Sequence, residues 1–591
     1  MAEDFVFGPA ESTAAVVEAR KTALAGFSHA HRLDPRDPLP GEPVVVRATA
    51  GPDVDAEPIW VYFTTDGSAP AGADGVATSG SAVPMTVTGV VWDDLVWGFV
   101  SHLEATIPGQ PEGTLVRYVI DVHGTLADGG EGSATRTDYF AYAVDSWNAP
   151  EWLRDAVMYY VMPDRFFPGS DRDWIQTDDT SRPMGGTLRG IREKLDYIQG
   201  MGFNALWLMP WMTGPTYHKY GTTDFFGVDP DFGTEQDLRD LIDDAHARGM
   251  KVLVDFVGNH VSDEHPIFVE AKADPTSAYR TWFDIHDDGD YLSFFGGGEL
   301  PHIQHNDPDA RRYILDVARA WVTDYGIDGY DLDYAVGPAH EFWAEFSHAV
   351  REVGDDVAIF TEGVTTPESL LSYVGRVDGC QDFAWCQAAR RTFGNGKLDV
   401  ARFERFLSGS ERFFPSGFVA PIMIDNQNMD RFLLVAGNDQ RRLRVAATCQ
   451  YSISQPISVW AGTEMGMSQR RSGATDLNHV RDATAWDDMD EQTVAHFRTL
   501  GALRAAHPAL ARGERVPLIA DAQTGVLAYR KQLAADQVTV VLNASDEARV
   551  VEVPAAGPVV DALDGREVTV TGGTATVRLA PWTSALLVST P

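Results

Sequence analysis

The sequence predicts an α/β protein built on a closed (β/α)8 (TIM) barrel with a β-rich domain on each side. Between residues 149 and 512, short apolar runs typical of buried parallel strands alternate with amphipathic stretches typical of helices. The regions before and after this part lack the alternation and read as short strands between turns. Eight apolar runs are present, as a closed barrel requires: Val157–Val161, Ala205–Met209, Val252–Phe256, Gly329–Asp333, Ala358–Glu362, Cys380–Phe383, Val419–Ile424 and Ile457–Trp460.

Residues 1–148 are expected to form an N-terminal β-sandwich, because short alternating runs are separated by Gly, Pro and Asp turn signals. Examples of the runs are Val44–Val46, Trp60–Phe63 and Val116–Ile120. Trp60, Trp92 and Trp97 could stack on sugars, but aromatic side chains in a small sandwich are more often core residues. We therefore expect these tryptophans in the core and predict no binding site there.

The last part of the chain, residues 513–591, is expected to be a C-terminal antiparallel β-sandwich. Its strand-like runs are Val516–Leu518, Val526–Tyr529, Gln537–Leu542 and Thr574–Leu579. Within the barrel region, residues 262–307 are too long for an ordinary barrel connection. They are expected to form an excursion domain after the third strand.

Composition narrows the possible partners. The chain has 86 Asp and Glu against 47 Lys and Arg, so its formal charge is −39. Such a polyanion repels nucleic acid and anionic membrane surfaces, and no apolar run is long enough to span a bilayer. The start of the chain lacks the pattern of a secretion signal, and the three cysteines show no disulfide or metal spacing. We therefore expect a cytoplasmic protein that binds neither nucleic acid nor membrane.

Carboxylates occur where four of the predicted strands end. They are Asp255 on the third strand, Asp331 and Asp333 on the fourth, Glu362 on the fifth and Asp425 on the seventh. Strand ends of a parallel barrel meet at one face, where such barrels carry their functional residues. Since burying like charges together is costly, a functional role is favoured over a structural one for this group.

The motifs around these carboxylates resemble those of the α-amylase family of glycoside hydrolases. Residues 255–260, Asp-Phe-Val-Gly-Asn-His, are similar to the family's first signature, and residues 329–333, 361–363 and 425–428 align with the second, third and fourth. Further matches lie at 186–190, 218–220, 229–234 and 462–466, in the family's order. The resemblance covers roughly residues 150–510.

The resemblance implies a retaining mechanism on α-glucosidic bonds, with two carboxyl groups dividing the chemistry. Asp333 would be the nucleophile, and Glu362 would be the general acid and base. His260 would bind a hydroxyl of the reacting sugar, and Tyr220 would stack beneath its ring. The other candidate substrate-binding residues are Asp224, Asp331, Gln427, Asn428 and Arg431.

A structural calcium ion is possible at Asn259, although an ordinary hydrogen bond at the strand end is an equally good interpretation. No cofactor is expected to be required. The expected partner is an oligosaccharide or another glucoside. The oligomeric state is left open, and a dimer is possible.

Three positions depart from the family pattern. Asp331 replaces the arginine that the family carries two residues before the nucleophile, and Gln427 and Asn428 replace its histidine and third carboxylate. Loss of one electrostatic partner of the transition state commonly lowers a rate by about 10²–10³. We therefore expect weak activity on ordinary α-glucosides and an unusual substrate. The added anion at Asp331 could suit a cationic or amino-bearing sugar, or an unusual linkage.

Two hypotheses remain open from the sequence. The first is a glycosidase or transglycosylase acting through Asp333 and Glu362; hydrolysis and transfer share one intermediate and cannot be separated here. The alternative is a catalytically silent carbohydrate-binding protein with an amylase-like barrel.

Overall fold

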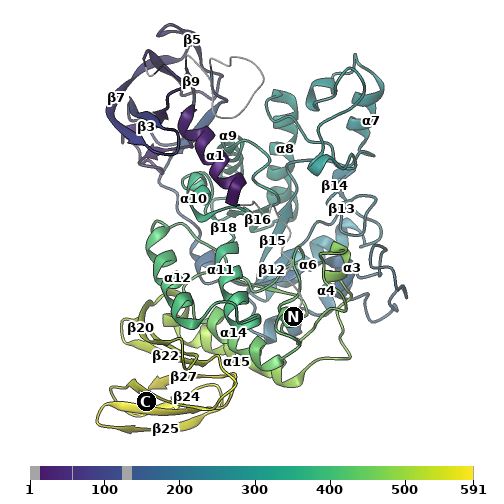
Figure 1. The fold of residues 1–591 in the computed structure, drawn as a ribbon. Coiled ribbons are helices and arrows are strands. Elements are labelled where there is room, and N and C mark those ends of the chain that lie inside the picture. The colour runs from purple at the N-terminus through teal and green to yellow at the C-terminus, as the bar shows by residue number, and fades with distance from the viewer. Residues whose placement is uncertain (1–12, 56, 123–135, 590–591) are drawn as a thin grey trace.

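The computed structural model describes residues 13–55, 57–122 and 136–589, and its centre is a parallel β-barrel (Figure 1). Seven strands follow the order β18-β17-β16-β15-β12-β11-β19, and every neighbouring pair is parallel. Apolar side chains buried on both faces explain why these segments form parallel strands. Their bounds are β11 Val157–Val161, β12 Ala205–Leu208, β15 Lys251–Phe256, β16 Gly329–Leu332, β17 Ala358–Thr361, β18 Gly379–Cys380 and β19 Ile457–Trp460.

An irregular segment that contains Val419 and Ile422 takes the place of the eighth barrel strand. The strands expected at 380–383 and 419–424 therefore need correction. Val419 bridges to Gly379 and Ile422 bridges to Ile457, so the barrel closes through isolated parallel bridges. A Cβ atom at Gly379 would lie 2.0 Å from the Val419 carbonyl oxygen, so this close approach requires glycine. The strand β18 ends early because the Asp382 side chain caps helix α11, which begins at Phe383.

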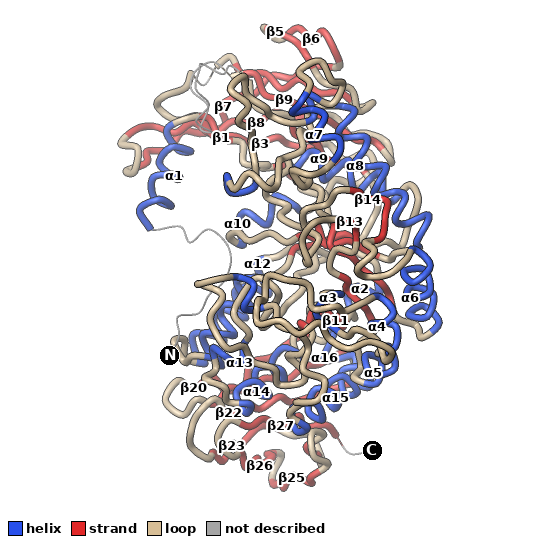
Figure 2. The backbone as a smooth tube through the Cα atoms, turned by 90° about the vertical axis from the view of Figure 1, so that its right-hand side faces the viewer, coloured by secondary structure: helices blue, strands red, loops and turns tan. Residues whose placement is uncertain are grey.

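Helices surround the barrel and alternate with its strands, which confirms the predicted fold class (Figures 1 and 2). Helix α6 shows how the sequence sets such an element: Thr234 and Asp237 form a capping box at its start, and its apolar face is buried. The longer helices are α6 Glu235–Ala247, α8 Pro308–Ala320, α9 His340–Arg351, α12 Val400–Phe413, α14 Gln440–Tyr451 and α15 Glu491–Ala506; α4 Leu188–Glu193, α5 Leu195–Gly200 and α11 Phe383–Ala389 are shorter.

The N-terminal β-domain has its own apolar core and an antiparallel sheet order β1-β3-β8-β7-β4-β9-β10. Its attachment to the barrel includes an ion pair of 3.2 Å between Arg117 of β9 and the buried Glu341 of α9. Its main elements are α1 Thr13–Ala25, β1 Phe27–Ser28, β2 Leu33–Asp34, β3 Val44–Ala50, β4 Ile59–Thr64, β7 Ser81–Asp93, β8 Gly98–Ile107, β9 Thr114–Asp121 and β10 Phe140–Val144, with a small β5–β6 hairpin at Ala71–Ala73 and Val76–Ser79.

The expectation that the tryptophans of this domain lie in its core is wrong for two of them. Trp97 is 78% exposed and Trp92 is 46% exposed, whereas Trp60 is half-buried. Trp92 and Trp97 belong to the outward side of the β7–β8 hairpin. There Trp92 packs edge-on against Trp97 and Phe99, so these side chains contact one another instead of the domain core.

After β15 the chain makes its expected excursion before it returns at α8. This segment contains α7 Pro266–Ala273 and the short turns Arg280–Trp282 and Phe294–Gly296. A backbone bridge between His260 and His302 ties it to the end of β15. The excursion therefore places Phe294 and its neighbours above the carboxyl ends of the strands.

The C-terminal β-domain lies at the other end of the molecule from the N-terminal one (Figures 1 and 2). Its antiparallel strands have the order β20-β21-β22-β27-β24-β25-β26-β23. The four runs predicted for it all lie in strands. The bounds are β20 Glu514–Asp521, β21 Val526–Leu533, β22 Asp536–Asn543, β23 Arg549–Pro554, β24 Val559–Asp561, β25 Arg566–Thr571, β26 Thr574–Leu579 and β27 Thr583–Ser589.

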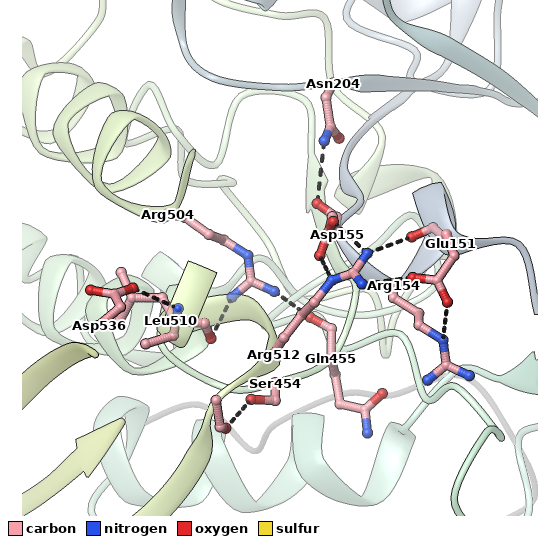
Figure 3. Close-up of polar contacts among 12 residues, drawn as sticks. Glu151, Arg154, Asp155, Asn204, Ser454, Gln455, Arg504, Leu510, Arg512 and Asp536 are labelled. Atoms are coloured by element: carbon pink, nitrogen blue, oxygen red, sulfur yellow. Dashed lines mark hydrogen bonds and ion pairs between the residues drawn. The ribbon is translucent and has the colours of Figure 1, made fainter. Parts of the chain in front are cut away.

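Two arginines on the last two helices before this domain, α15 and α16 (Pro508–Arg512), fasten the end of the barrel region to its other parts (Figure 3). Arg512, at the end of α16, contacts Glu151 and Asp155 at 2.6 Å each, so it joins the last barrel helix to the first. The buried Arg504 donates to the carbonyl oxygens of Tyr451, Ile453 and Gln455 at 2.7–2.9 Å.

Among the described residues, none of the helices has the length and the apolar character that a membrane-spanning helix requires.

The junction between β11 and β19 contains a buried carboxyl group, Glu464. Its Oε1 accepts hydrogen bonds from the hydroxyls of Tyr159 and Tyr197 at 2.7 and 3.1 Å, and its Oε2 accepts from the Gly462 amide at 3.0 Å. Burial outweighs these donors and raises the pKa of Glu464 to about 7.

A Glu464→Gln variant should lose part of the pH dependence of stability. A folded-state pKa above the unfolded value gives stability that is present at low pH and is lost as pH rises through about 7. Between pH 5 and pH 8 the wild type should lose about 2 kcal/mol that the amide variant does not lose. Thermal unfolding at both pH values measures this, with exposed Glu567→Gln as the control. Parallel pH curves for wild type and Glu464→Gln would contradict the assignment.

Candidate active site

A cavity of about 320 Å³ opens at the carboxyl ends of the barrel strands. This is the face at which such barrels carry their chemistry. Segments far apart in the chain supply its walls: the loop before β14 (Asp224–Val228), the excursion, the ends of β16 and β17, and the loops after the irregular eighth wall and β19. The polar lining residues are His218, Tyr220, His260, Asp333, Glu362, Asn428 and Arg481, and the apolar ones are Phe294, Phe295, Leu300, Tyr334, Val336, Val364 and Leu477.

Two carboxyl groups, Asp333 and Glu362, lie together in this cavity because their strands are neighbours. Asp333 follows β16, and its amide donates to the Phe256 carbonyl oxygen at 3.1 Å; Glu362 follows β17, and its amide donates to that of Leu332 at 3.0 Å. Both side chains are buried, at 9% and 6% exposure. The two backbone hydrogen bonds therefore fix the points at which both carboxyl groups enter the cavity.

Glu362 is in an environment that suits a proton donor. Burial raises its pKa, while hydrogen bonds from the Asn428 side chain at 3.0 Å and from the Tyr334 amide, together with the charge of Arg481, act in the opposite direction. Tyr334 has φ of +45°, a left-handed conformation that few non-glycine residues adopt. This conformation accompanies the turn of the Tyr334 amide toward Glu362.

Several neighbouring groups act on the pKa of Asp333, in opposite directions. Burial, the adjacent Glu362 and the deeper Asp255 raise its pKa, and the positive charge of Arg481 lowers it. When two close carboxyl groups share a buried site, repulsion between two negative charges makes the pair hold on to one proton. The pair therefore suits a division into one ionised carboxylate and one carboxylic acid.

The loop that presents His218 and Tyr220 is held by a buried ion pair. Lys219 is 2% exposed, and its ammonium group contacts Asp229 at 2.7 Å and the Gly214 carbonyl oxygen at 3.0 Å. The Tyr220 hydroxyl donates to Asp255 at 2.8 Å and accepts from the Gln427 amide at 3.1 Å. These contacts fix the Tyr220 ring at the cavity wall.

Two histidines line the cavity in their neutral form, because burial lowers the pKa of both, that of His260 to about 3. Nδ1 of His218 accepts the Tyr220 amide at 3.2 Å, which leaves the proton on Nε2. Nε2 of the fully buried His260 has no hydrogen-bond partner among the described residues. Both can therefore pair with hydroxyl groups of a ligand that fills the cavity.

Asp331 lies one layer deeper than Asp333. Alternation along β16 puts both on the barrel interior, but Asp331 pairs in register with Asp255, and both of its carboxylate oxygens accept from Gln381 at 3.0–3.1 Å. It is absent from the described lining of the cavity. The idea that its charge selects an amino-bearing sugar thus has no direct contact to support it.

The remaining predicted residues lie in different places. Gln427 is not part of the described lining but contacts two lining residues, Tyr220 through its side chain and Arg481 through its backbone carbonyl, whereas Asn428 lines the cavity. Asp224 and Arg431 are not part of the described lining: Asp224 is exposed at the start of β14, and Arg431 donates to the Ala461 carbonyl oxygen at 3.0 Å and packs over Trp460.

Asn259 is the position at which a structural calcium ion is expected as an alternative to an ordinary hydrogen bond, and its side chain is buried. Its side-chain nitrogen lies 3.1 Å from His260 Nδ1, and its carbonyl oxygen accepts the Ile303 amide. Over residues 13–55, 57–122 and 136–589, no group of three or more His, Cys, Asp or Glu side chains could hold a metal ion. The chemistry below depends on no calcium ion.

Sequence reasoning missed several lining residues, above all Arg481. This arginine lies in the long loop after β19, where neither strand periodicity nor the four signatures indicate a place in the site. His218 stands in a recognised motif but carried no assigned role. Phe294 and Phe295 lie within the predicted excursion, whose path the sequence does not show.

Comparisons with known proteins show which family the barrel region matches. The family model described as the catalytic domain of alpha amylase matches residues 160–499. "Alpha-amylase 2" of Dictyoglomus thermophilum is 31% identical over 463 residues, which cover 77% of this chain and 79% of that protein.

Two solved structures extend the comparison. The cyclic α-maltosyl-(1→6)-maltose hydrolase of Arthrobacter globiformis has a TM-score of 0.67 and 27% identity, and the match covers 75% of this chain and 99% of that one. The same hydrolase is known in complex with its cyclic sugar and with maltose. A cyclomaltodextrinase structure, at 23% identity and a TM-score of 0.70, matches 96% of this chain and all of that one, which shows the same fold across all three parts.

The barrel fold and these matches define a glycoside hydrolase. More specifically, the chain belongs to the α-amylase family, and it is an enzyme of the α-amylase type.

An Asn428→Asp variant should move the alkaline limb of the pH profile of kcat/KM to higher pH. A carboxylate cannot donate to Glu362 and adds a negative charge beside it, so both changes favour the protonated form of this acid. Asn428→Ala removes the donor without adding charge and should give a smaller shift. An unchanged limb, or one that moves to lower pH, would show that Asn428 does not act on the acid.

Proposed function

We propose that the protein cleaves α-glucosidic bonds by double displacement, with Asp333 as the nucleophile and Glu362 as the acid and base. The observation that carries this proposal is the pair of buried carboxyl groups on neighbouring strand ends, in one cavity, beside neutral histidines and an aromatic wall. Retaining enzymes hold such groups about 5–5.5 Å apart.

In the first step Glu362 gives its proton to the glycosidic oxygen while a carboxylate oxygen of Asp333 bonds to the anomeric carbon. The bond from that carbon to the leaving oxygen breaks, and a glycosyl ester on Asp333 forms. In the second step the ionised Glu362 takes a proton from water or from a sugar hydroxyl, and that oxygen displaces Asp333. Water gives hydrolysis and a sugar gives transfer, so both outcomes use the same residues.

The proposed substrate is an α-linked oligosaccharide. The apolar wall formed by Phe294, Phe295, Tyr334 and Leu477 suits the faces of sugar rings, and His218, His260 and Asn428 suit their hydroxyl groups. The comparisons favour the same class, since the similar proteins are an amylase, a cyclomaltodextrinase and a hydrolase of a cyclic maltosyl sugar.

We propose further that the subsite of the reacting sugar is atypical. Where the family has an arginine, a histidine and a third carboxylate, this chain has Asp331, Gln427 and Asn428, so fewer charges act on the transition state. Activity on maltose-type substrates should accordingly be low. We also propose a cytoplasmic location, which suits three buried cysteines without disulfides.

The glycosyl ester provides the test. With an activated α-glucosyl substrate whose leaving group needs no acid, Glu362→Gln should still form the ester and should hydrolyse it slowly. Mass spectrometry of the intact protein and of its peptides should place a hexosyl group on Asp333, and Asp333→Asn should carry none.

Asp425→Asn is a matched control, because Asp425 is a buried carboxyl of the barrel outside the described cavity lining. It should leave the ester on Asp333. Tight binding of oligosaccharides without any ester or turnover, across a broad panel, would instead establish the silent carbohydrate-binding protein.

A further inference from the structure

Arg481 is a buried arginine of the cavity, at 5% exposure, whose side chain is fixed by the groups beside the acid. Its Nε donates to the Gln427 carbonyl oxygen at 3.0 Å, and an Nη donates to Asn428 Oδ1 at 2.8 Å. Because a guanidinium group has donors only, it accepts nothing from these partners. The contacts aim its positive charge at the same cavity that Asp333 and Glu362 line.

The arginine determines which end of the Asn428 amide faces Glu362. Oδ1 of Asn428 accepts from Arg481, and this leaves Nδ2 to donate to Glu362 Oε1 at 3.0 Å. A carboxylate at position 428 would have an acceptor at both ends. The hydrogen bonds therefore run in one direction, from the Arg481 guanidinium to the Asn428 amide and from that amide to the Glu362 carboxyl group. This chain depends on both Arg481 and an amide at position 428.

The loop that carries Arg481 is itself anchored. The Tyr217 hydroxyl donates to Asn478 Oδ1 at 2.5 Å, and the Arg165 guanidinium lies over the Tyr217 ring at 3.9 Å from its centre. Val480, the preceding residue, is fully buried. These contacts hold the guanidinium in place before any sugar binds.

The charge of Arg481 is needed because the cavity is rich in carboxyl groups. Asp333 faces Glu362, with Asp255 and Asp331 beneath it, the Tyr220 hydroxyl beside it, and the neutral His218 and His260 on the same cavity wall. Among the described lining residues, Arg481 carries the positive charge, and it lowers the pKa of Asp333. It comes from the loop after β19, across the barrel from β16.

We propose that Arg481 is the positioning residue of this site: it supplies the counter-charge that Asp331 cannot, and it holds the Asn428 amide toward Glu362. This inference rests on the proposed function, since it assigns how the same two carboxyl groups are poised. It also accounts for the joint presence of Asp331 and Asn428. The family places a cation beside the nucleophile, at the position of Asp331, and here Arg481 supplies that charge from across the barrel, in contact with the Asn428 amide.

The test compares Arg481→Met and Arg481→Lys with Arg471→Met, a change of an exposed arginine on the same loop. In Arg481→Met the acidic limb of kcat/KM should move to higher pH by about one unit, because an ionised Asp333 loses its counter-charge. The rate at the optimum should fall about 10²-fold. Arg481→Lys keeps the charge but loses the two-pronged contact, so its limb should move less. Arg471→Met should match the wild type.

A second measurement separates charge from folding. Arg481→Ala leaves a guanidinium-sized space, and guanidinium chloride at low millimolar concentration should restore part of its activity and shift the acidic limb back, while sodium chloride at equal ionic strength should not. Folded variants with a wild-type limb and no rescue would overturn the role of Arg481 while leaving the ester on Asp333 intact. A wild type that forms no ester and turns over no substrate would overturn the proposed function as well, so the two failures are distinguishable.

Discussion

The site depends on one electrostatic constraint: four carboxyl groups, Asp255, Asp331, Asp333 and Glu362, are buried at one end of a barrel with few positive charges near them. Burial raises the pKa of each of these groups, and repulsion from neighbouring carboxylates adds to this for Asp255, Asp331 and Asp333. The protein meets the constraint with neutral donors for the deeper pair and with a cation for the outer pair. Tyr160, Tyr220 and Trp207 donate to Asp255, and Gln381 donates to Asp331.

This arrangement separates a structural layer from a chemical layer. Asp255 and Asp331 lie below the cavity and are occupied by hydrogen bonds from the barrel itself. Asp333 and Glu362 lie one layer higher, where a ligand can reach them beneath the aromatic residues of the excursion. The excursion therefore does more than lengthen the loop after β15, since Phe294 lies against both His260 and Tyr334 with ring centres 5.1 and 4.7 Å apart. An apolar cover strengthens every charge interaction inside the cavity.

Much of the fold could be predicted from the sequence because buried parallel strands leave a clear pattern. Val157–Val161 and Val252–Phe256 are predominantly apolar runs between helical stretches, and the structure confirms the barrel that they indicate. The pattern fails where the barrel closes by isolated bridges, because Val419–Ile424 pairs through single contacts and Phe383 already belongs to a helix. It also fails for Trp92 and Trp97, because alternation does not tell which side of a hairpin faces solvent.

The site shows the same division. Asp333 and Glu362 could be placed together because both stand at strand ends, and Asp331 could have been assigned to the layer below from the two-residue period of a strand. Arg481 could not be found in this way. Its position follows from the path of a loop that is held by Tyr217 and Asn478, two residues far apart in the chain. Loops of this kind carry no periodic pattern, so their contribution becomes visible only in three dimensions.

If Asp333 attacks the sugar directly and is then displaced, the anomeric configuration is inverted twice. Proton NMR of the first product formed from an α-linked oligosaccharide, recorded before mutarotation, measures this outcome. With Asp333 as the nucleophile, the new reducing end should appear first as the α-anomer. Initial release of the β-anomer would mean a single displacement by water, which would contradict the assignment of Asp333 as nucleophile.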